Sequence, residues 1–321
     1  MNLRQVDLTG HQDQLPAEQN HNTELVIVTW IFVMMFFLLA GWLIYLNVFK
    51  SESLRSNINN TKADSRSENV IRGNIVTEGG TLLASTDVDG DGNETRSYPY
   101  ENVFAHVIGY ATNGKAGLEA EENYELLTSH SSLLTQVQAE NEGKKIQGDT
   151  VVVTLDEKLQ QAAYYALGSY KGAVVVMEPG SGKILAMVSK PDFNPSTISQ
   201  EWENMMADES SSALLNRATQ GLYPPGSVFK MVTTTAWIKE HPEDYSSFSW
   251  NCEGTLTDGD VTITCYNGEV HGQEDLGLAF ANSCNTAFAH IGLELDNEDL
   301  RSTAEDFLFN RPLPTALQHS E

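Results

Sequence analysis

The stretch Tyr-Pro-Pro-Gly-Ser-Val-Phe-Lys at residues 223–230 decides the fold of this chain. A Pro-Pro-Gly turn cannot continue a helix, whereas the residues from Ser227 onwards can form one, so Ser227 is predicted at or near its first turn. Ser227 and Lys230 then share one helix face. A serine hydroxyl becomes a useful nucleophile when a base takes its proton, and a lysine with a lowered pKa is such a base. The spacing therefore indicates a site for acylation chemistry.

Taken alone, this spacing is a weak signal, because an ordinary helix start followed by an exposed lysine has the same pattern. A second polar group adds to it. Ser283 and Asn285 interrupt the apolar, small-residue segment 279–292, for which we expect a buried helix. Polar side chains are costly to bury without partners, so these two are candidates for a site. The alternative is that they are helix caps.

With both groups in place, the chain resembles the transpeptidase domain of penicillin-binding proteins, whose signatures are Ser-x-x-Lys, a Ser-x-Asn-type motif and Lys-Thr-Gly. Ser227 matches the acylated serine and Lys230 its partner lysine. Ser283 and Asn285 match the second motif.

The segments before the serine are also similar to this family. Residues 172–179 and 182–189 look like its first strand pair, and residues 215–223 look like its approach to the nucleophile. Without the family, the two β-branched runs around Gly180-Ser181-Gly182 predict a hairpin.

The third family motif, Lys-Thr-Gly or Lys-Ser-Gly, is missing from this chain, since no lysine follows Lys239. The sequence ends at Glu321, 36 residues after Asn285. We therefore expect a fragment or truncated product of a longer enzyme, with weak activity or none. The alternative is a degenerate family member that binds without catalysis.

A membrane anchor is predicted near the N-terminus, because residues 25–47 carry no charged side chain. A helix rising about 1.5 Å per residue crosses the roughly 30 Å hydrocarbon core over this length. Trp30, Trp42 and Tyr45 lie towards its ends, as interfacial aromatic residues do. The stretch is too long for a signal peptide and no cleavage site follows it, which favours an uncleaved signal anchor.

The orientation of this anchor is a choice between two arguments. The preceding tail carries only Arg4, whereas Lys50, Arg55, Lys62 and Arg66 follow the span, so the positive-inside rule would place the large region in the cytoplasm. The resemblance implies a substrate found only outside the membrane. We therefore expect a cytoplasmic N-terminus and an extracellular catalytic region.

The region between the anchor and the transpeptidase part divides in two. Residues 51–68 are polar and predict a juxtamembrane linker. Short strands are expected at 72–75 and 80–85, with the pattern continuing from Tyr98 to Glu119. The Arg-Gly-x-Ile and Gly-Leu-Glu landmarks here are similar to the small non-catalytic region of monofunctional penicillin-binding proteins. We expect a spacer and docking surface.

Residues 87–92, Asp-Val-Asp-Gly-Asp-Gly, have a calcium-loop pattern. An EF-hand loop needs a glutamate at its twelfth position, which here is Tyr98, and it needs flanking helices that the neighbouring glycines and proline disfavour. A turn joining two strands is the preferred interpretation.

The cysteines are Cys252, Cys265 and Cys284. Outside the membrane a Cys252–Cys265 disulfide could close a short loop, and this pairing is left open. Together with His271 these residues make up a three-Cys, one-His set, but the short Cys-x-x-Cys spacing of structural zinc sites is absent, so no metal is expected. In helical geometry the side chain of Cys284 points away from those of its two neighbours.

Composition narrows the class of partner. The chain has 321 residues, 40% hydrophobic and 20% charged, which suits a globular protein with a sizeable core. Its net charge of −25 argues against nucleic acid and against an anionic lipid face.

Together these observations predict an α/β (α+β) protein with a partial penicillin-binding or serine β-lactamase-like transpeptidase domain. The expected parts are a cytoplasmic tail (1–24), a transmembrane signal anchor (25–47), a linker with a small β-rich pedestal (48–150) and the N-terminal part of the transpeptidase domain (151–321).

The resemblance implies a D,D-transpeptidase without a cofactor. Neutral Lys230 would take the proton of Ser227, which attacks a peptidoglycan stem peptide ending in D-Ala-D-Ala. Ser283 would relay a proton to the leaving amine, and Asn285 would bind the substrate amide. β-Lactam antibiotics would acylate the same serine, and membrane proteins of cell division or elongation are the expected partners. The alternatives are a β-lactam sensor or serine β-lactamase, and a non-catalytic scaffold of cell-wall assembly.

Overall fold

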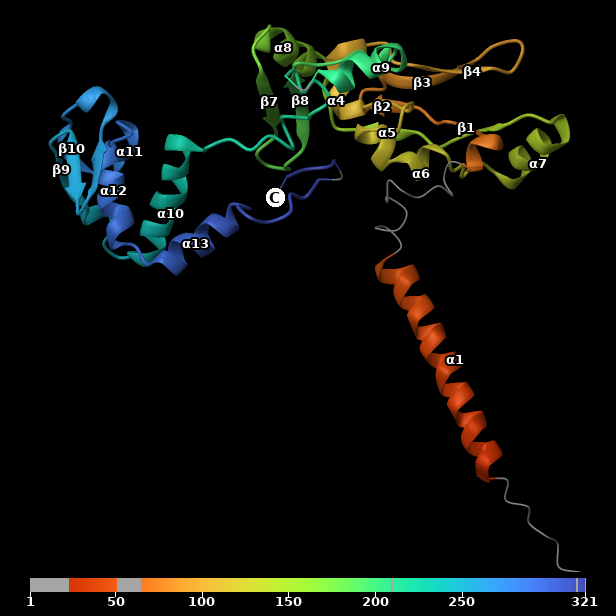
Figure 1. Ribbon diagram of the computed structural model, residues 1–321, viewed down its shortest axis with the longest axis horizontal. Coiled ribbons are helices and arrows are strands. Elements are labelled where there is room, and N and C mark those ends of the chain that lie inside the picture. Colours follow the sequence, from red (N-terminus) through yellow and green to blue (C-terminus); the bar gives the residue numbers. More distant parts are fainter. Residues whose placement is uncertain (1–22, 51–64, 209, 316, 321) are drawn as a thin grey trace, which may run out of the picture. The chain divides into compact units, whose positions relative to one another are not determined.

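The computed structural model describes residues 23–50, 65–208, 210–315 and 317–320. The chain divides into two compact units, residues 1–55 and 56–321, and each is described by itself. The first contains α1 (Thr23–Phe49), a 27-residue helix without buried side chains (Figure 1). Its length and its mean hydropathy of 2.5 suffice to cross a membrane. The predicted tail, up to residue 22, and the linker over 51–64 lie outside the described residues.

A four-stranded sheet with the strand order β4-β3-β2-β6 organises the first part of the second unit. β2 pairs antiparallel with β3, β3 antiparallel with β4, and β2 parallel with β6. The strands predicted near 72–75 and 80–85 are present as β2 and β3, shifted towards the C-terminus. The elements here are η1 (Ser65–Glu68), β1 (Val70–Ile71), β2 (Ile75–Thr77), β3 (Leu82–Val88), β4 (Glu94–Ser97), β5 (Ile146–Gln147), which pairs with β1, and β6 (Val151–Val153).

The aspartate-rich segment 87–92 runs from the end of β3 into the turn before β4. The Oδ1 atom of Asp89 accepts hydrogen bonds from the backbone N–H groups of Asp91 (2.9 Å) and Asn93 (2.8 Å). The side chain thus holds its own turn together, as aspartate does in Asx-turns. The prediction of a turn joining two strands is confirmed.

The prediction that strands continue from Tyr98 to Glu119 is wrong, because this segment is mainly helical. Its apolar residues Phe104, Val107 and Ile108 follow helical spacing and are buried. Gly109 ends the helix with a φ of 78°, and a Cβ there would lie 1.7 Å from the Ala116 carbonyl oxygen. The helices are η2 (Glu101–Phe104), α4 (Ala105–Ile108), α5 (Gly117–Glu121), α6 (Asn123–Leu126) and α7 (Leu133–Glu142).

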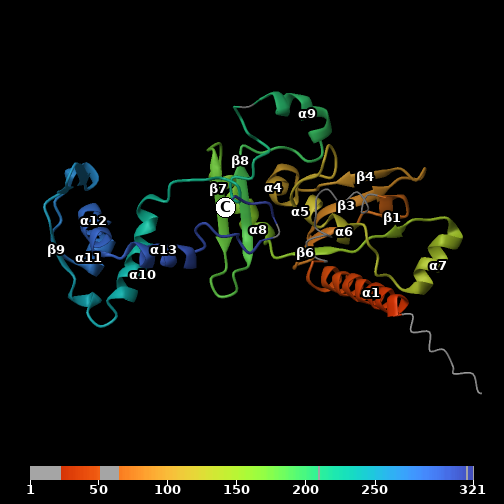
Figure 2. The ribbon, with the colours of Figure 1, turned by 60° about the horizontal axis from the view of Figure 1, so that its bottom comes forward.

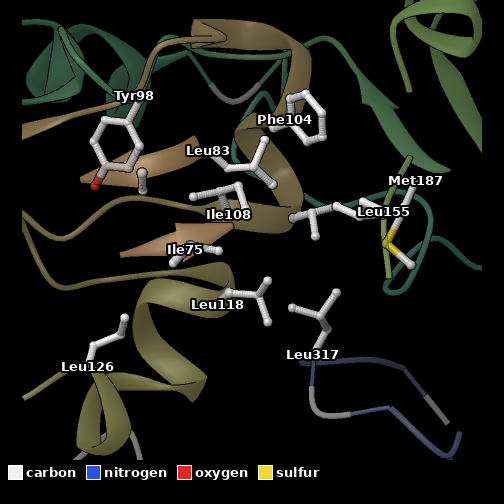
Figure 3. Packing of buried hydrophobic residues seen from close by; sticks show 12 residues of the cluster. Ile75, Leu83, Tyr98, Phe104, Ile108, Leu118, Leu126, Leu155, Met187 and Leu317 are labelled. Atoms are coloured by element: carbon white, nitrogen blue, oxygen red, sulfur yellow. The ribbon is translucent and has the colours of Figure 1, made fainter. Parts of the chain in front are cut away.

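These helices and the sheet share one hydrophobic core. Figure 3 shows Ile75 and Leu83 from the strands facing Ile108 of α4 and Leu118 of α5. Met187, from a later strand, joins the same cluster. Burial of such side chains contributes about 1.5–3 kcal/mol each. The core therefore links the small sheet to the segments that follow it.

A buried ion-pair network joins the two sequence landmarks of this region. Arg72 and Arg96 donate from their Nε atoms to the Oε2 and Oε1 atoms of Glu119, at 2.5 and 2.7 Å. The carboxylate is wholly buried, and burial without such partners would cost several kcal/mol. Arg72 and Glu119 belong to the Arg-Gly-x-Ile and Gly-Leu-Glu segments. The ion pair between Arg72 and Glu119 therefore holds these two segments together.

The predicted hairpin around Gly180–Gly182 is confirmed as β7 (Gly172–Met177) paired antiparallel with β8 (Ile184–Lys190). α8 (Glu157–Leu167) packs against both strands (Figures 1 and 2). Its buried Gln160 donates from Nε2 to the carbonyl of Met187 and accepts from the N–H of the same residue, both at 2.8 Å. α9 (Ile198–Ala207) follows the hairpin.

The last part of the chain has its own hydrophobic core, in which α10, α11 and α12 meet β9. Trp237, Phe248, Phe288 and Ile291 are its large members. Two antiparallel pairs, β9 with β12 and β10 with β11, lie in this part. Its elements are η3 (Gly226–Phe229), α10 (Lys230–Glu240), η4 (Tyr245–Ser247), β9 (Ser249–Cys252), β10 (Thr255–Asp258), β11 (Val261–Thr264), η5 (Tyr266–Gly268), β12 (Gly272–Asp275), α11 (Leu276–Ala281), α12 (Asn285–Glu294) and α13 (Asn297–Asp306).

Candidate active site

Ser227 lies in the short helix η3, directly before α10, so the predicted helix start is confirmed. Gly226, at a φ of 55°, makes the turn from the two prolines into this helix. The serine side chain is exposed, and within the described residues its hydroxyl makes no hydrogen bond. It is therefore open to a reacting molecule.

Lys230, the first residue of α10, is bound to the second polar motif. Its Nζ donates to the carbonyl oxygen of Ser283 (2.6 Å), to the Oγ of the same residue (2.9 Å) and to the Oδ1 of Asn285 (2.7 Å). Its side chain is half-buried, and this burial lowers the pKa of Lys230 below its ordinary value. A depressed pKa is what a lysine base needs.

The prediction of one buried helix through the second motif is wrong, because the chain breaks between α11 and α12. Ser283 adopts a left-handed conformation with a φ of 51°, which costs a non-glycine residue about 1–2 kcal/mol. The break turns the Ser283 carbonyl and hydroxyl towards Lys230. A regular helix would instead use that carbonyl in its own hydrogen-bond ladder.

Cys284, rather than its polar neighbours, caps α12. Its Sγ accepts a hydrogen bond from the N–H of Ala287 at 3.4 Å, which excludes the interpretation of Asn285 as the helix cap. Asn285 instead bridges two elements, because its Nδ2 donates to the carbonyl of Thr264 at 2.9 Å while its Oδ1 accepts from Lys230. This amide ties α10, α12 and the end of β11 together.

The four residues predicted for the site thus fall into two groups. Lys230, Ser283 and Asn285 are joined by hydrogen bonds, and Ser227 lies one helical turn before the lysine. The arrangement provides a free hydroxyl, a basic amine of lowered pKa and a second hydroxyl that shares the amine. Such a set can acylate a serine and move its proton.

Next to this site the structure gathers Cys252, Cys265, Cys284 and His271, although their spacing in the sequence argued against it. Each offers a ligand atom, and these atoms all lie within 4.8 Å of one another. The three cysteines are buried free thiols, so the Cys252–Cys265 pair left open above is not bonded here. The register of β9 and β12 pairs Cys252 with Gly272 and thereby brings His271 to the thiols. In the sequence, only the alternation of side chains along the short strands β9 and β12 could have indicated that these four residues lie together.

Comparison with known proteins agrees with this geometry. Residues 172–320 match the penicillin binding protein transpeptidase domain, and residues 72–151 match the penicillin binding protein A dimerisation domain. The chain belongs to the penicillin-binding protein family. The predicted family and its mixed helix and sheet fold are thus confirmed.

Individual penicillin-binding proteins are similar along most of this chain. The peptidoglycan D,D-transpeptidase PbpA of Mycolicibacterium smegmatis is 33% identical over 313 residues, covering 91% of this chain and 63% of the relative. The PbpA of Mycobacterium tuberculosis is 34% identical over 295 residues, covering 85% and 60%. The chain therefore spans about three fifths of the length of these curated relatives.

Solved structures give the same result. Penicillin-binding protein A from M. tuberculosis, in its penicillin G acyl-enzyme complex, superposes with a TM-score of 0.69 at 34% identity, over 78% of this chain and 62% of that one. The D,D-transpeptidase domain of a peptidoglycan glycosyltransferase from Eggerthella lenta gives 0.68 at 34% identity, over 78% and 56%.

Proposed function

We propose that this chain carries the acylating half of a peptidoglycan D,D-transpeptidase that cross-links stem peptides through Ser227. The observation that supports this most is the binding of Lys230 Nζ by both Ser283 and Asn285. That contact joins the first two family motifs across 53 residues of sequence. An ordinary helix start with an exposed lysine would have no such partners.

The proposed first step is attack of Ser227 Oγ on the penultimate D-Ala carbonyl of a stem peptide. Lys230 in its neutral form takes the hydroxyl proton as the C–O bond forms. The tetrahedral intermediate then expels terminal D-Ala, whose amine receives a proton by way of Ser283 Oγ, 2.9 Å from Lys230 Nζ. An acyl-enzyme ester remains on Ser227.

The proposed second step transfers this acyl group to the amine of another stem peptide. The amine attacks the ester carbonyl, loses its proton to the same Lys230–Ser283 pair, and releases Ser227 as a free hydroxyl. The substrate amide is proposed to bind Asn285, whose Nδ2 and Oδ1 are held by Thr264 and Lys230.

β-Lactams are proposed to acylate the same serine. The M. tuberculosis relative forms a penicillin G acyl-enzyme, and that structure superposes on most of this chain. The test is labelling of the detergent-solubilised chain with a fluorescent penicillin, followed by peptide mass spectrometry. An adduct on Ser227 that is lost in Ser227→Ala supports the proposal. Undiminished labelling of that variant would sink it.

We propose that these 321 residues acylate slowly by themselves. The chain contains no Lys-Thr-Gly motif, and in this family a strand carrying that motif supplies the second oxyanion donor. Loss of one such donor typically lowers the rate about 100- to 1,000-fold. The labelling rate, compared with that of the M. smegmatis relative, measures this deficit. An equal rate would show that the missing motif is dispensable.

A non-catalytic scaffold of cell-wall assembly is the second candidate. The discriminating experiment replaces the chromosomal gene by one encoding Ser227→Ala. Growth and cell shape that stay normal support the scaffold, whereas loss of growth support favours the enzyme. Membrane proteins of division or elongation are the proposed partners in either case.

The proposed topology places residues 1–24 in the cytoplasm, the anchor at 25–47, and the pedestal (48–150) and transpeptidase part (151–321) outside. The apolar helix α1, which carries no charged residue between Leu25 and Asn47, supports the anchor. The orientation rests on the proposed peptidoglycan substrate, which lies outside the membrane. Protease added to spheroplasts should cleave the region around Ser227. Protection of that region in intact spheroplasts, with cleavage only after lysis, would refute the topology.

A further inference from the structure

We propose that Cys252, Cys265, Cys284 and His271 form a tetrahedral zinc site beside the second motif. The Sγ atoms of Cys252 and Cys265 lie 3.7 Å apart, those of Cys265 and Cys284 3.8 Å, and His271 Nδ1 lies 3.4 Å from the Sγ of Cys252. Zinc bonds of about 2.3 Å to sulfur and about 2.0–2.1 Å to nitrogen set tetrahedral edges of about 3.8 Å and 3.6 Å. Three of the six edges thus lie close to these values, and all four ligand atoms lie within 4.8 Å of one another.

Backbone N–H groups donate to two of the three sulfur atoms. The N–H of Gly254 donates to Cys252 Sγ and the N–H of Ala287 to Cys284 Sγ, each at 3.4 Å. All three cysteines are buried, with exposed fractions of 0 to 2%. Backbone N–H donors stabilise sulfur in its charged form, the form that binds a metal. Zinc binding would release the three thiol protons to solvent.

A buried carboxylate, that of Glu274, lies beside the proposed ligands. Glu274 is 2% exposed, and its Oε1 accepts from Asn282 Nδ2 at 2.9 Å. Its Oε2 has no hydrogen-bond partner among the described residues and lies 4.0 Å from the Nδ1 of His271. A buried charge without a partner is costly.

The imidazole is also oriented for this role. Nδ1 of His271 faces the thiols, and Nε2 faces the exposed Glu269 carboxylate at 3.8 Å. Metal-binding histidines usually direct their second nitrogen to a carboxylate, which fixes the tautomer and the ring. A disulfide explains the cluster less well, because pairing any two of three thiols leaves the third thiol and the histidine without a role.

The site bears on the proposed function because one ligand is the central residue of the second motif. Cys284 lies between Ser283 and Asn285, the two residues that hold Lys230. A metal bound to Cys284 and Cys265 would join the start of α12 to the end of β11, the two elements that Asn285 already links. Cys284 would thus be a positioning residue, through which the metal fixes the left-handed turn at Ser283.

Metal content of the full, detergent-solubilised chain tests the site. Under a phosphine reductant, with zinc alone as the probe, we expect one zinc per chain. Cobalt in its place should give the visible bands of tetrahedral coordination and a sulfur-to-cobalt charge-transfer band. Cys252→Ser, Cys284→Ser and His271→Gln should each weaken zinc binding by at least about tenfold.

A matched control separates this site from a partly exposed group made by Glu125, His130 and Asp149, whose ligand atoms also lie within 4.8 Å of one another. His130→Gln should leave zinc binding unchanged. Binding that survives Cys284→Ser but falls in His130→Gln would overturn the proposal. So would an octahedral cobalt spectrum, a disulfide in the reduced wild-type chain, or no bound metal.

The positioning role needs a readout other than stability, because the variants could fail to fold. Wild-type chain stripped by a chelator is compared with the same sample reloaded with zinc, and the circular dichroism of the two is matched. Faster acylation by fluorescent penicillin in the zinc form is expected. Equal rates would refute positioning and leave the metal site standing. If no acylation occurs in either form, the proposed function fails while the cobalt spectrum still decides the site.

Discussion

Lys230 Nζ lies 2.7 Å from Asn285 Oδ1, so that a helix start and a helix break 55 residues apart share one amine. The contact holds the lysine where it can reach Ser227 in the preceding turn. It also makes the lysine the residue on which the proposed chemistry depends.

Replacing this lysine should abolish most acylation. In Lys230→Met the serine loses its base, and general-base catalysis is typically worth about 100- to 10,000-fold in rate. Lys239→Met, on the same helix, removes an exposed contact with Asp306 and should label at the wild-type rate. Stopped-flow labelling with fluorescent penicillin measures both. Equal loss in the two variants would point to helix damage.

Acylation should rise with pH, and a carboxylate beside the lysine should move that rise. Burial lowers the pKa of Lys230 from its ordinary 10.5, so the reactive neutral amine forms at lower pH than in water. In Asn285→Asp a negative charge favours the ammonium form and raises the pKa of Lys230. The pH profile of the labelling rate should therefore shift to more alkaline values. A shift towards acid would contradict a lysine base.

The left-handed residue in the second motif permits a paired test. Ser283→Ala keeps the unfavourable φ of 51°, whereas Ser283→Gly relieves it. Both remove the hydroxyl that contacts Lys230, so both should acylate more slowly. In thermal unfolding the glycine variant should be more stable than the alanine variant by about 1 kcal/mol. The reverse order would show that the turn carries no strain.

The buried network in the pedestal should be far more sensitive than a surface pair. Glu119→Gln removes the charge shared by Arg72 and Arg96 and should lower the free energy of unfolding by about 3–5 kcal/mol. Glu78→Gln breaks an exposed pair with Lys183 and should cost less than about 1 kcal/mol. Urea unfolding of the two variants compares them. Similar losses would mean that the buried pair is weak.

Local patterns in the sequence predicted the parts of the fold that depend on neighbouring residues. The β7–β8 hairpin follows from two apolar runs around a glycine turn, and the start of α10 follows from the prolines before Ser227. The break at Ser283 was missed because apolar, small residues lie on both sides of the polar group and favour one continuous helix. The break has local helix-ending bonds, from the N–H of Ser283 to Phe280 and of Cys284 to Ala279. It is also joined to Lys230, a distant contact that no local pattern carries.

The thiol cluster was missed for a related reason. Its ligands come from β9, from the residue after β11, from the residue before β12 and from the start of α12, and only strand pairing brings these together. The segment around Phe104–Ile108 shows a different error, because strands were predicted there and helices are found. Its apolar residues suit either periodicity over so short a stretch, and packing against the small sheet decides for the helix.

The strand β6 has a mechanical consequence. The N–H of Glu78 donates to the carbonyl of Val153 at 3.0 Å, and Thr154 Oγ1 and the N–H of Asp156 donate to the carbonyls of Ile184 and Leu185. Over residues 153–156 the chain is thus hydrogen-bonded first to the end of β2 and then to β8. A force applied to the four-stranded sheet would therefore act directly on these hydrogen bonds, because they connect the sheet to the hairpin. The pedestal and the hairpin are expected to move together under tension.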